Sequence, residues 1–243
     1  MVRKQIPVLD VMIDAVSMPE AVRVVENFIA ERKTRFIATA NAEMVMLAQT
    51  DAELAGILNH ADLVIPDGAG VVWAARYHHH AMPERVAGYD LVQHLLDKSA
   101  RSGYRVYFFG GAPGVAEQAR LYAQERYPGV KVVGVRDGYF AAEDEPEIIN
   151  NIKLCKPDIL FAALGVPKQE KWLIRNLAEL EVPVSIGVGG TFDVMAGVVV
   201  RAPLWMQKAN LEWLYRLLSQ PHRALRMLAL PRFMLKVIAS KKD

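Results

Sequence analysis

Asp67 is the side chain of this sequence best placed to act as a base. It lies between Pro66 and Gly68, directly after the apolar run of residues 62–65. A carboxylate at the end of a buried strand is partly desolvated, which raises its pKa and improves it as a proton acceptor. An aspartate in this place is equally suited to cap a helix that begins near Gly68. The motif therefore predicts either a catalytic base or a helix cap.

Polar side chains also mark the end of the preceding apolar run, residues 35–40. Thr39 lies near its end and Asn41 just after it. Both can hydrogen-bond a ligand, and Asn41 is also a suitable cap for a helix beginning at Ala42. Arg85 is a candidate for binding phosphate, because a guanidinium matches two phosphate oxygens at once. A surface ion pair is the ordinary alternative for this arginine.

Two glycine-rich turns offer backbone N–H groups to an anion. Gly110 and Gly111 stand between an apolar run and a helical pattern, and Gly189 and Gly190 follow the last such run. Helix N-termini bind phosphate, and glycine lets a ligand approach the backbone closely. The first turn lacks the G-x-G-x-x-G order of dinucleotide-binding loops, so it gives an NAD-dependent enzyme little support. Both pairs are compatible with phosphate contact and with a plain tight turn.

Gln169 lies in the first turn of a predicted helix, where its amide can hydrogen-bond a sugar or a base. No metal ion or other cofactor is expected. The consecutive histidines 78–80 would point about 100° apart on a helix, so they could not bind one ion together. The sequence also has no Asp-x-Asp pair to hold Mg²⁺ or Mn²⁺ against a diphosphate.

The elements that must position these residues alternate between strands and helices. Apolar runs without alternation indicate strands buried on both faces. The predicted strands span residues 7–13, 35–40, 62–65, 105–109, 130–136, 158–164 and 184–188, and the predicted helices span 18–33, 42–60, 90–102, 113–127, 144–154 and 168–180. This order indicates an α/β fold with a mostly parallel, Rossmann-like sheet flanked by helices. Ligands bind at the carboxyl ends of such strands, where the candidate loops share one rim.

Residues 201–243 differ in charge from the rest of the chain. Of the 29 basic and 27 acidic residues, this segment holds nine basic ones against Glu212 and Asp243, a net charge of +7. Residues 1–200 hold the other 20 basic and 25 acidic residues, a net charge of −5. Bulky apolar residues are interleaved with the basic ones, which favours an anionic membrane surface over nucleic acid as the partner. Contact with a second copy of the chain is the blander alternative.

The same segment shows no strand pattern. We expect a helical appendage, interrupted at Pro221 and Pro231, beside a catalytic domain of residues 1–200. On a continuous helix Arg216, Arg223 and Arg226 would fall within about 80° of one another. These arginines are candidates for contact with a lipid diphosphate or with the membrane surface.

Composition limits the compartment and the mode of membrane contact. Cys155 is the only cysteine, which excludes an intramolecular disulfide and fits a reducing cytoplasm. The N-terminus does not show a secretory signal pattern. No apolar stretch reaches the roughly 18 residues needed to cross a bilayer. We therefore expect a cytoplasmic protein whose contact with the membrane is peripheral.

Several motifs in order resemble the WecG/TagA/CpsF glycosyltransferase family. They are Thr39-Ala40-Asn41, Pro66-Asp67-Gly68, residues 156–172, Gly189-Gly190-Thr191-Phe192-Asp193, residues 201–208 and residues 211–217. The resemblance covers nearly the whole chain. It implies an inverting, metal-independent transfer of N-acetylmannosamine from a UDP donor to the 4-hydroxyl of N-acetylglucosamine on undecaprenyl diphosphate. Such a step belongs to pathways like wall teichoic acid synthesis at the inner membrane face.

The resemblance also implies roles for the candidate residues. Asp67 would be the base, with Asp193 a weaker second candidate. The residues expected to position the substrates or to stabilise the diphosphate are Thr39, Asn41, Arg85 and Gln169, with the glycine pairs beside them. The donor could instead be the uronic acid of the same sugar. A non-catalytic nucleotide-binding module that docks on a membrane is the alternative from a different functional class.

Overall fold

The apolar runs form a six-stranded parallel sheet in the computed structural model, which describes residues 3–209, 211–219 and 229–240. The strand order is β4-β3-β8-β7-β5-β6. The strands are β3 (Arg35–Ala40), β4 (Leu63–Pro66), β5 (Arg105–Gly110), β6 (Lys131–Arg136), β7 (Ile159–Ala163) and β8 (Val184–Gly187). Every neighbouring pair is parallel, which confirms the predicted fold class and brings all carboxyl ends to one rim.

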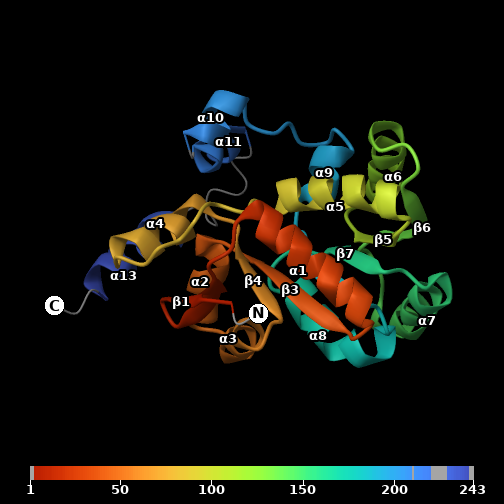
Figure 1. The fold of residues 1–243 in the computed structure, drawn as a ribbon, viewed down its shortest axis with the longest axis horizontal. Helices are drawn as coiled ribbons and strands as arrows, with labels where there is room; N and C mark the ends of the chain where they lie inside the picture. Colours follow the sequence, from red (N-terminus) through yellow and green to blue (C-terminus); the bar gives the residue numbers. More distant parts are fainter. Residues whose placement is uncertain (1–2, 210, 220–228, 241–243) are drawn as a thin grey trace.

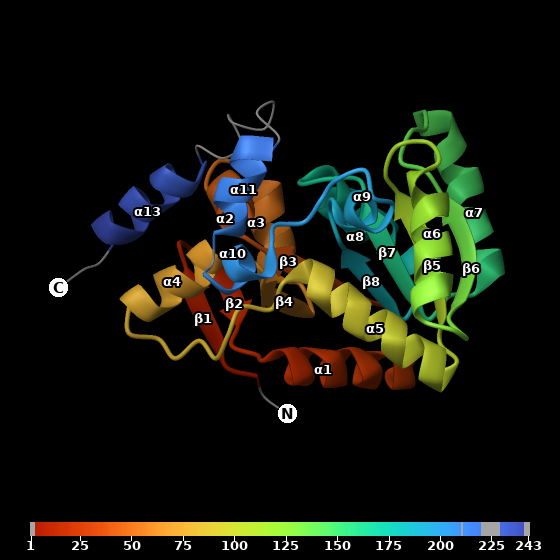
Figure 2. The same cartoon turned by 90° about the horizontal axis from the view of Figure 1, so that it is seen from above.

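Helices cover both faces of this sheet (Figures 1 and 2). Successive strand residues point to opposite faces, and both faces are apolar: Phe36 faces one side, and Ile37 the other. The Phe36 face is covered by α2 (Ala42–Ala48), α3 (Ala52–Asn59), α4 (Ala69–Tyr77), α7 (Glu145–Cys155) and α8 (Lys168–Leu180). The Ile37 face is covered by α1 (Met18–Glu31), α5 (Gly88–Ser102), α6 (Val115–Arg126) and α9 (Thr191–Met195). The core therefore has two halves, one on each side of the sheet.

The N-terminal segment is a hairpin, so the single strand predicted over residues 7–13 is wrong. β1 (Gln5–Val8) and β2 (Val11–Asp14) pair antiparallel, and Leu9 and Asp10 turn between them with positive φ angles. Asp10 is a residue type that favours turns, but Leu9 is not, so the pair lacks the Asn-Gly or Asp-Gly pattern that marks a two-residue hairpin turn. The buried Asp14 carboxylate accepts a hydrogen bond from the Val64 amide at 2.8 Å, which attaches the hairpin to β4.

Two helical regions also differ from the prediction. The range 42–60 is divided into α2 and α3 at Asp51, whose side chain accepts a hydrogen bond from the Leu54 amide at 3.0 Å and starts a new helix. The helix α4 begins at Ala69 with Gly68 as its N-cap residue, which agrees with the helix considered near Gly68, but its extent to Tyr77 was not predicted. A further short 3₁₀ turn, η1 (Ala142–Asp144), precedes α7.

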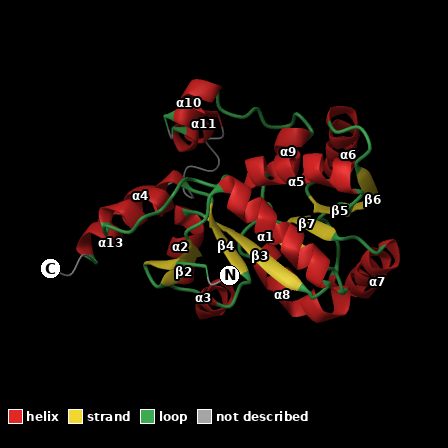
Figure 3. Cartoon of the chain, in the orientation of Figure 1, coloured by secondary structure: helices red, strands yellow, loops and turns green. Residues whose placement is uncertain are grey.

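The C-terminal segment is helical, as predicted. Its helices are α10 (Leu204–Lys208), α11 (Glu212–Ser219) and α13 (Ala229–Ala239). A loop joins α9 to α10 (Figure 3), and α13 lies beside α4 (Figures 1 and 2). In the part of the chain that the structure describes, no helix has both the length and the apolar character needed to cross a membrane.

Part of this segment belongs to the core. In α13, Phe233 and Val237 are buried against α2 and α4. Pro231 lies in the first turn of α13, where its missing N–H breaks no helical hydrogen bond, so the interruption predicted there is wrong. Pro221 lies outside the described residues. The helix α13 is thus attached to the α/β part of the chain through apolar side chains.

Replacing Phe233 by alanine should release α13 from the core. The Phe233 side chain is fully buried, and its removal costs about 3–5 kcal/mol. Hydrogen exchange of the α13 amides, followed by mass spectrometry, should therefore accelerate by about 100-fold or more. Leu235→Ala on the same helix is the matched control, because Leu235 is 69% exposed. Equal exchange rates in the two variants would contradict the docking of α13 through Phe233.

Candidate active site

The strand order brings the predicted site residues to one rim of the sheet. The ends of β4, β3, β8, β7 and β5, with the loops after them, are neighbours there in that order. They contain, in the same order, Asp67, then Thr39 and Asn41, then Gly189 and Gly190, then Gln169, and finally Gly110 and Gly111. Hydrogen bonds join consecutive loops, so these residues belong to one connected rim, in which Thr39 and Gln169 are buried.

Asp67 is held at the end of β4 by two other segments. Its amide donates to the Ala40 carbonyl of β3 at 2.9 Å. Its Oδ1 accepts a hydrogen bond at 2.7 Å from the amide of Gly88, the first residue of α5. Gly68 is the N-cap residue of α4, so Asp67 does not occupy the cap position considered from the sequence. Its carboxylate instead meets the start of α5, where an amide and the helix dipole both stabilise negative charge.

Thr39 and Asn41 fix the loops next to Asp67. Thr39 is buried, and its Oγ1 donates to the Gly187 carbonyl at 3.0 Å, which ties β3 to β8. Asn41 Oδ1 accepts from the Met44 amide at 3.0 Å, which confirms the predicted cap of α2. A Cβ on Gly68 would lie 3.0 Å from Asn41 Cβ, so the two loops are in contact. Both residues therefore shape the rim, whatever ligand they bind.

Gly110 and Gly111 form a close junction between β5 and β7. Gly110 has a φ of 123°, and a Cβ there would lie 2.4 Å from the carbonyl carbon of Ala163. The Gly111 amide donates to the Ala163 carbonyl at 2.9 Å. The sheet itself thus requires glycine at this turn. The N-terminus of α6 follows at Val115, and phosphate contact there stays a prediction.

Gln169 connects the loop after β7 to the loop after β8. Its Oε1 accepts from the amides of Gly165 at 3.2 Å and Gly189 at 3.1 Å. Its Nε2 donates to Glu170 Oε1 at 2.7 Å. The side chain is completely buried, so most of its hydrogen-bonding capacity is used inside the protein. Its influence on a ligand would pass through the two loops that it holds together.

Glu170 is a buried carboxyl group that was not predicted from the sequence. Lys168 and Lys171 lie on either side of it, a charged pattern typical of an exposed helical turn. It lies beside Gly187, where an added Cβ would be 3.0 Å from Glu170 Oε1. Its Oε2 has no hydrogen-bond partner. Burial raises the pKa of Glu170 to about 7, while the hydrogen bond from Gln169 acts in the opposite direction. A titratable group thus lies beneath the rim.

Asp193 also lies at the rim, in the short helix α9. A Cβ on Gly190 would be 3.4 Å from a carboxylate oxygen of Asp193. Thr191 Oγ1 donates to the Val188 carbonyl at 2.7 Å, which closes the glycine turn. Asp193 is therefore placed after β8, two strands along the rim from Asp67.

Arg85 links Asp67 to the C-terminal segment. Its Nε donates to the Asp67 backbone carbonyl at 2.9 Å, and its Nη2 pairs with the carboxylate of Glu212 in α11. Only 19% of the Arg85 side chain is exposed. The ion pair considered from the sequence therefore exists, but it lies within the rim instead of on an open surface.

A second arginine shares the Glu212 carboxylate. Arg201 Nε donates to Glu212 Oε1 at 3.0 Å, and its two Nη atoms donate to the Asp90 carboxylate at 2.5 and 2.9 Å. Burial raises the pKa of Glu212, but Arg85 and Arg201 outweigh burial and hold the pKa below its ordinary value. Breaking a buried pair of this kind costs about 3–5 kcal/mol.

The arginines predicted to meet a lipid diphosphate are only partly described. Arg216 lies in α11, one turn after Glu212. Arg223 and Arg226 lie outside the described residues. Their contact with lipid stays a prediction.

The three consecutive histidines follow the end of α4. His78 is the C-cap residue, and His79 has a φ of 60°, so they do not continue the helix. Among residues 3–209, 211–219 and 229–240, no three His, Cys, Asp or Glu side chains are grouped so that they could hold a metal ion.

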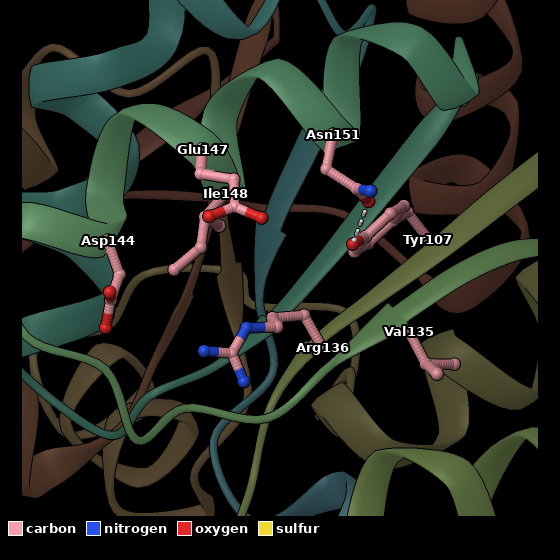
Figure 4. A pocket seen from close by; sticks show the side chains of 7 residues that line it. All are labelled: Tyr107, Val135, Arg136, Asp144, Glu147, Ile148 and Asn151. Atoms are coloured by element: carbon pink, nitrogen blue, oxygen red, sulfur yellow. Dashed lines mark hydrogen bonds between the residues drawn. The ribbon is translucent and has the colours of Figure 1, made fainter.

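A pocket of about 210 Å³ lies beside β6, at the opposite edge of the sheet from β4 and Asp67 (Figure 4). It is lined by Tyr107, Val135, Arg136, Asp144, Glu147, Ile148 and Asn151. The Tyr107 hydroxyl donates to Asn151 Oδ1 at 2.9 Å, and Arg136 pairs with Asp137 at 2.7 Å. The pocket is separate from the site around Asp67.

Glu170→Gln should remove a pH dependence of stability. The folded-state pKa of about 7 lies above the ordinary 4.5, so the contribution of Glu170 is fully present below pH 4.5 and is lost as the pH rises through 7. Between these values the free energy of unfolding of the wild type should fall by roughly 1.4 kcal/mol per pH unit relative to the variant. Urea denaturation at about pH 5 and about pH 8 measures the difference.

Glu179→Gln is the matched control, because Glu179 is exposed on the same helix. It should follow the wild type at both pH values. A Glu170→Gln variant that also follows the wild type would contradict the raised pKa.

Comparison with known proteins identifies a family and several relatives that match nearly the whole chain. The model of the Glycosyl transferase WecG/TagA/CpsF family matches residues 6–243. A protein of Bacillus spizizenii is 36% identical over 216 residues, which cover 89% of this chain and 83% of that protein. A Bacillus subtilis protein is 35% identical over 218 residues, covering 90% and 84%. A Staphylococcus aureus protein is 34% identical over 240 residues, covering 98% and 94%.

All three relatives carry the name N-acetylglucosaminyldiphosphoundecaprenol N-acetyl-beta-D-mannosaminyltransferase. The matched region includes every loop of the rim and the C-terminal helices. The family resemblance of the ordered motifs is thereby confirmed. This protein belongs to the WecG/TagA/CpsF family of glycosyltransferases.

Proposed function

We propose that this protein transfers N-acetylmannosamine from UDP to the 4-hydroxyl of N-acetylglucosamine on undecaprenyl diphosphate, in the synthesis of the wall teichoic acid linkage unit. One observation carries the proposal: relatives matched over at least 83% of their own length are named for joining N-acetyl-beta-D-mannosamine to N-acetylglucosaminyldiphosphoundecaprenol. The carboxylate at the rim supplies the base that such a transfer needs.

Asp67 is the general base in this proposal. The acceptor oxygen attacks the anomeric carbon while its proton passes to the Asp67 carboxylate. The bond from that carbon to the nucleotide oxygen breaks, and its electron pair leaves with UDP. A beta-linked product from an alpha-linked UDP sugar requires such an inverting displacement. The hydrogen bond from Gly88 at 2.7 Å supports this role, because it fixes the orientation of the carboxylate.

The departing diphosphate needs positive charge, and we propose that it comes without a metal ion. Arg85 supplies a guanidinium beside Asp67, and the N-terminus of α6 supplies backbone amides beyond Gly110 and Gly111. Thr39, Asn41 and Gln169 hold the intervening loops, so they would position the donor through the shape of the rim. Asp193 is the second candidate for the base.

We further propose that residues 201–243 attach the enzyme to the anionic inner face of the cell membrane. Leu204, Trp205, Leu218 and Leu235 are between 65% and 73% exposed on the helices of this segment. Such side chains, mixed with Lys and Arg, suit an anionic lipid surface, where each basic residue adds about 1 kcal/mol. The inner side of α13 already packs on the core, so its exposed side chains are additional apolar surface.

Asp67→Asn should reduce the rate of transfer by about 100- to 10,000-fold, because the amide cannot accept the proton. Its oxygen can still accept the hydrogen bond from Gly88, so the thermal unfolding midpoint should change little. Asp10→Asn at the exposed turn of the hairpin is the control and should keep the wild-type rate. Wild-type transfer by Asp67→Asn would eliminate Asp67 as the base and leave Asp193 as the candidate.

Trp205→Ser combined with Leu235→Ser should weaken binding to vesicles of anionic phospholipid by about tenfold or more, because each change removes apolar surface available to the bilayer. Vesicle co-sedimentation measures the affinity. Leu154→Ser is the control, since Leu154 is 72% exposed on α7, away from the C-terminal helices. Point substitutions are preferable to a chain ending near Val200, which would also remove Phe233 from the core.

Unchanged vesicle binding in the double variant would contradict the membrane role. If light scattering then gave a smaller molecular mass than for the wild type, the same residues would be a contact between copies of the chain.

A further inference from the structure

Glu212 is a buried acidic residue in the basic C-terminal segment. Glu212 is the only Asp or Glu in residues 201–242. Its carboxylate is buried, although the neighbouring Trp213 is exposed. A buried carboxylate is costly unless it is paired, and here one oxygen binds Arg201 while the other binds Arg85. In a segment that is otherwise basic, this residue anchors α11 to the rim.

Two routes of contact lead from Glu212 to Asp67. In the first, Arg85 donates to the Glu212 carboxylate through Nη2 and to the Asp67 backbone carbonyl at 2.9 Å through Nε. In the second, Arg201 binds Asp90, which lies in the first turn of α5, and the first amide of α5 donates to the Asp67 carboxylate. One route thus holds the backbone of Asp67, and the other holds its side chain.

We infer that Glu212 is a positioning residue for sugar transfer: by docking α11 on Arg85 and Arg201, it sets the orientation of the Asp67 carboxylate. This inference rests on the proposed function, in which Asp67 takes the proton. It makes the catalytic arrangement depend on the C-terminal segment, since the base is fully held only when α11 is docked.

A competing role makes the opposite prediction. Glu212 could occupy Arg85 in place of a substrate diphosphate, so that its removal would strengthen substrate binding. The pairing with Arg201 favours positioning, because that arginine is held by Asp90 and by the face of Tyr89, 4.6 Å from its ring centre. Glu212 therefore has a fixed partner that a ligand at Arg85 would not displace.

The test compares four full-length proteins: wild type, Glu212→Gln, Asp67→Asn and the double variant. Glu212→Gln preserves size and removes the charge. Its kcat should fall by about 10- to 100-fold, with the KM for the UDP donor changed by less than about threefold. In the Asp67→Asn background, Glu212→Gln should change the residual rate by less than about threefold, because both substitutions act on the same proton transfer.

Glu179→Gln serves as the control for loss of a carboxylate, since this exposed side chain takes no part in the site. Hydrogen exchange provides a readout that needs no activity. In Glu212→Gln, the amides of residues 65–70 and of α11 should exchange faster, whereas those of α8 should keep the wild-type rate.

If Glu212→Gln lowered the rate of transfer by the same factor in the wild type and in Asp67→Asn, the two effects would be independent and the inference would be overturned. A lower KM for the UDP donor in Glu212→Gln would also overturn it. Absence of transfer by the wild type would refute the proposed function instead. The exchange measurement then decides the inference alone: faster exchange of residues 65–70 in Glu212→Gln supports positioning, and unchanged exchange refutes it.

Discussion

The hydrogen bond from the Gly88 amide to the Asp67 carboxylate is the interaction around which the site is organised. It joins the end of β4 to the start of α5, a helix that packs on the Ile37 face of the sheet. The Val86 amide adds a second connection, donating to the Pro66 carbonyl at 3.0 Å. A carboxylate in such a place keeps a defined direction, which a base in a displacement reaction requires.

The neighbouring strands and loops of the rim are joined to one another by close backbone packing and by side-chain hydrogen bonds. Gly110 lets β5 reach the end of β7, and Gln169 joins the loops after β7 and β8. Thr39 then ties β8 to β3, next to Asp67. Each of these residues has a structural partner, so the surface presented to a ligand is shaped before any ligand arrives. A preorganised polar site of this kind lowers the cost of aligning the reacting groups.

The basic C-terminal segment is attached to the acidic remainder of the chain at two places. The C-terminal helices are held by Phe233 in the core and by Glu212 at the rim. Their exposed side chains include the basic residues Lys208, Arg232 and Lys236 and the apolar residues Leu204, Trp205 and Leu235. The segment thus has an inner side that contacts the α/β part of the chain and an outer side that carries exposed basic and apolar side chains. The proposed attachment to a membrane requires such an outer side.

Local sequence signals predicted what depends on local structure. The six strands of the parallel sheet, the rim loops and the Asn41 cap follow from apolar runs, turn residues and capping preferences, and all of these were found. The burial of Glu170 and the anchoring by Glu212 were not predicted, since both depend on distant partners; Glu212 lies 127 positions from Arg85. The turn at Leu9 and Asp10 was missed because a single aspartate after an apolar leucine does not make a hairpin-turn pattern. The placement of the candidate residues at one rim could therefore be predicted from the sequence, whereas the distant contacts that hold them could not.

The most direct measurement of the central claim is a transfer assay with a short-chain lipid diphosphate carrying N-acetylglucosamine and a panel of UDP sugars, analysed by mass spectrometry with and without EDTA. The account predicts addition of a single N-acetylhexosamine from UDP-N-acetylmannosamine, at the same rate in EDTA. Transfer only from the uronic acid donor, dependence on a divalent ion, or no product with any donor would contradict it.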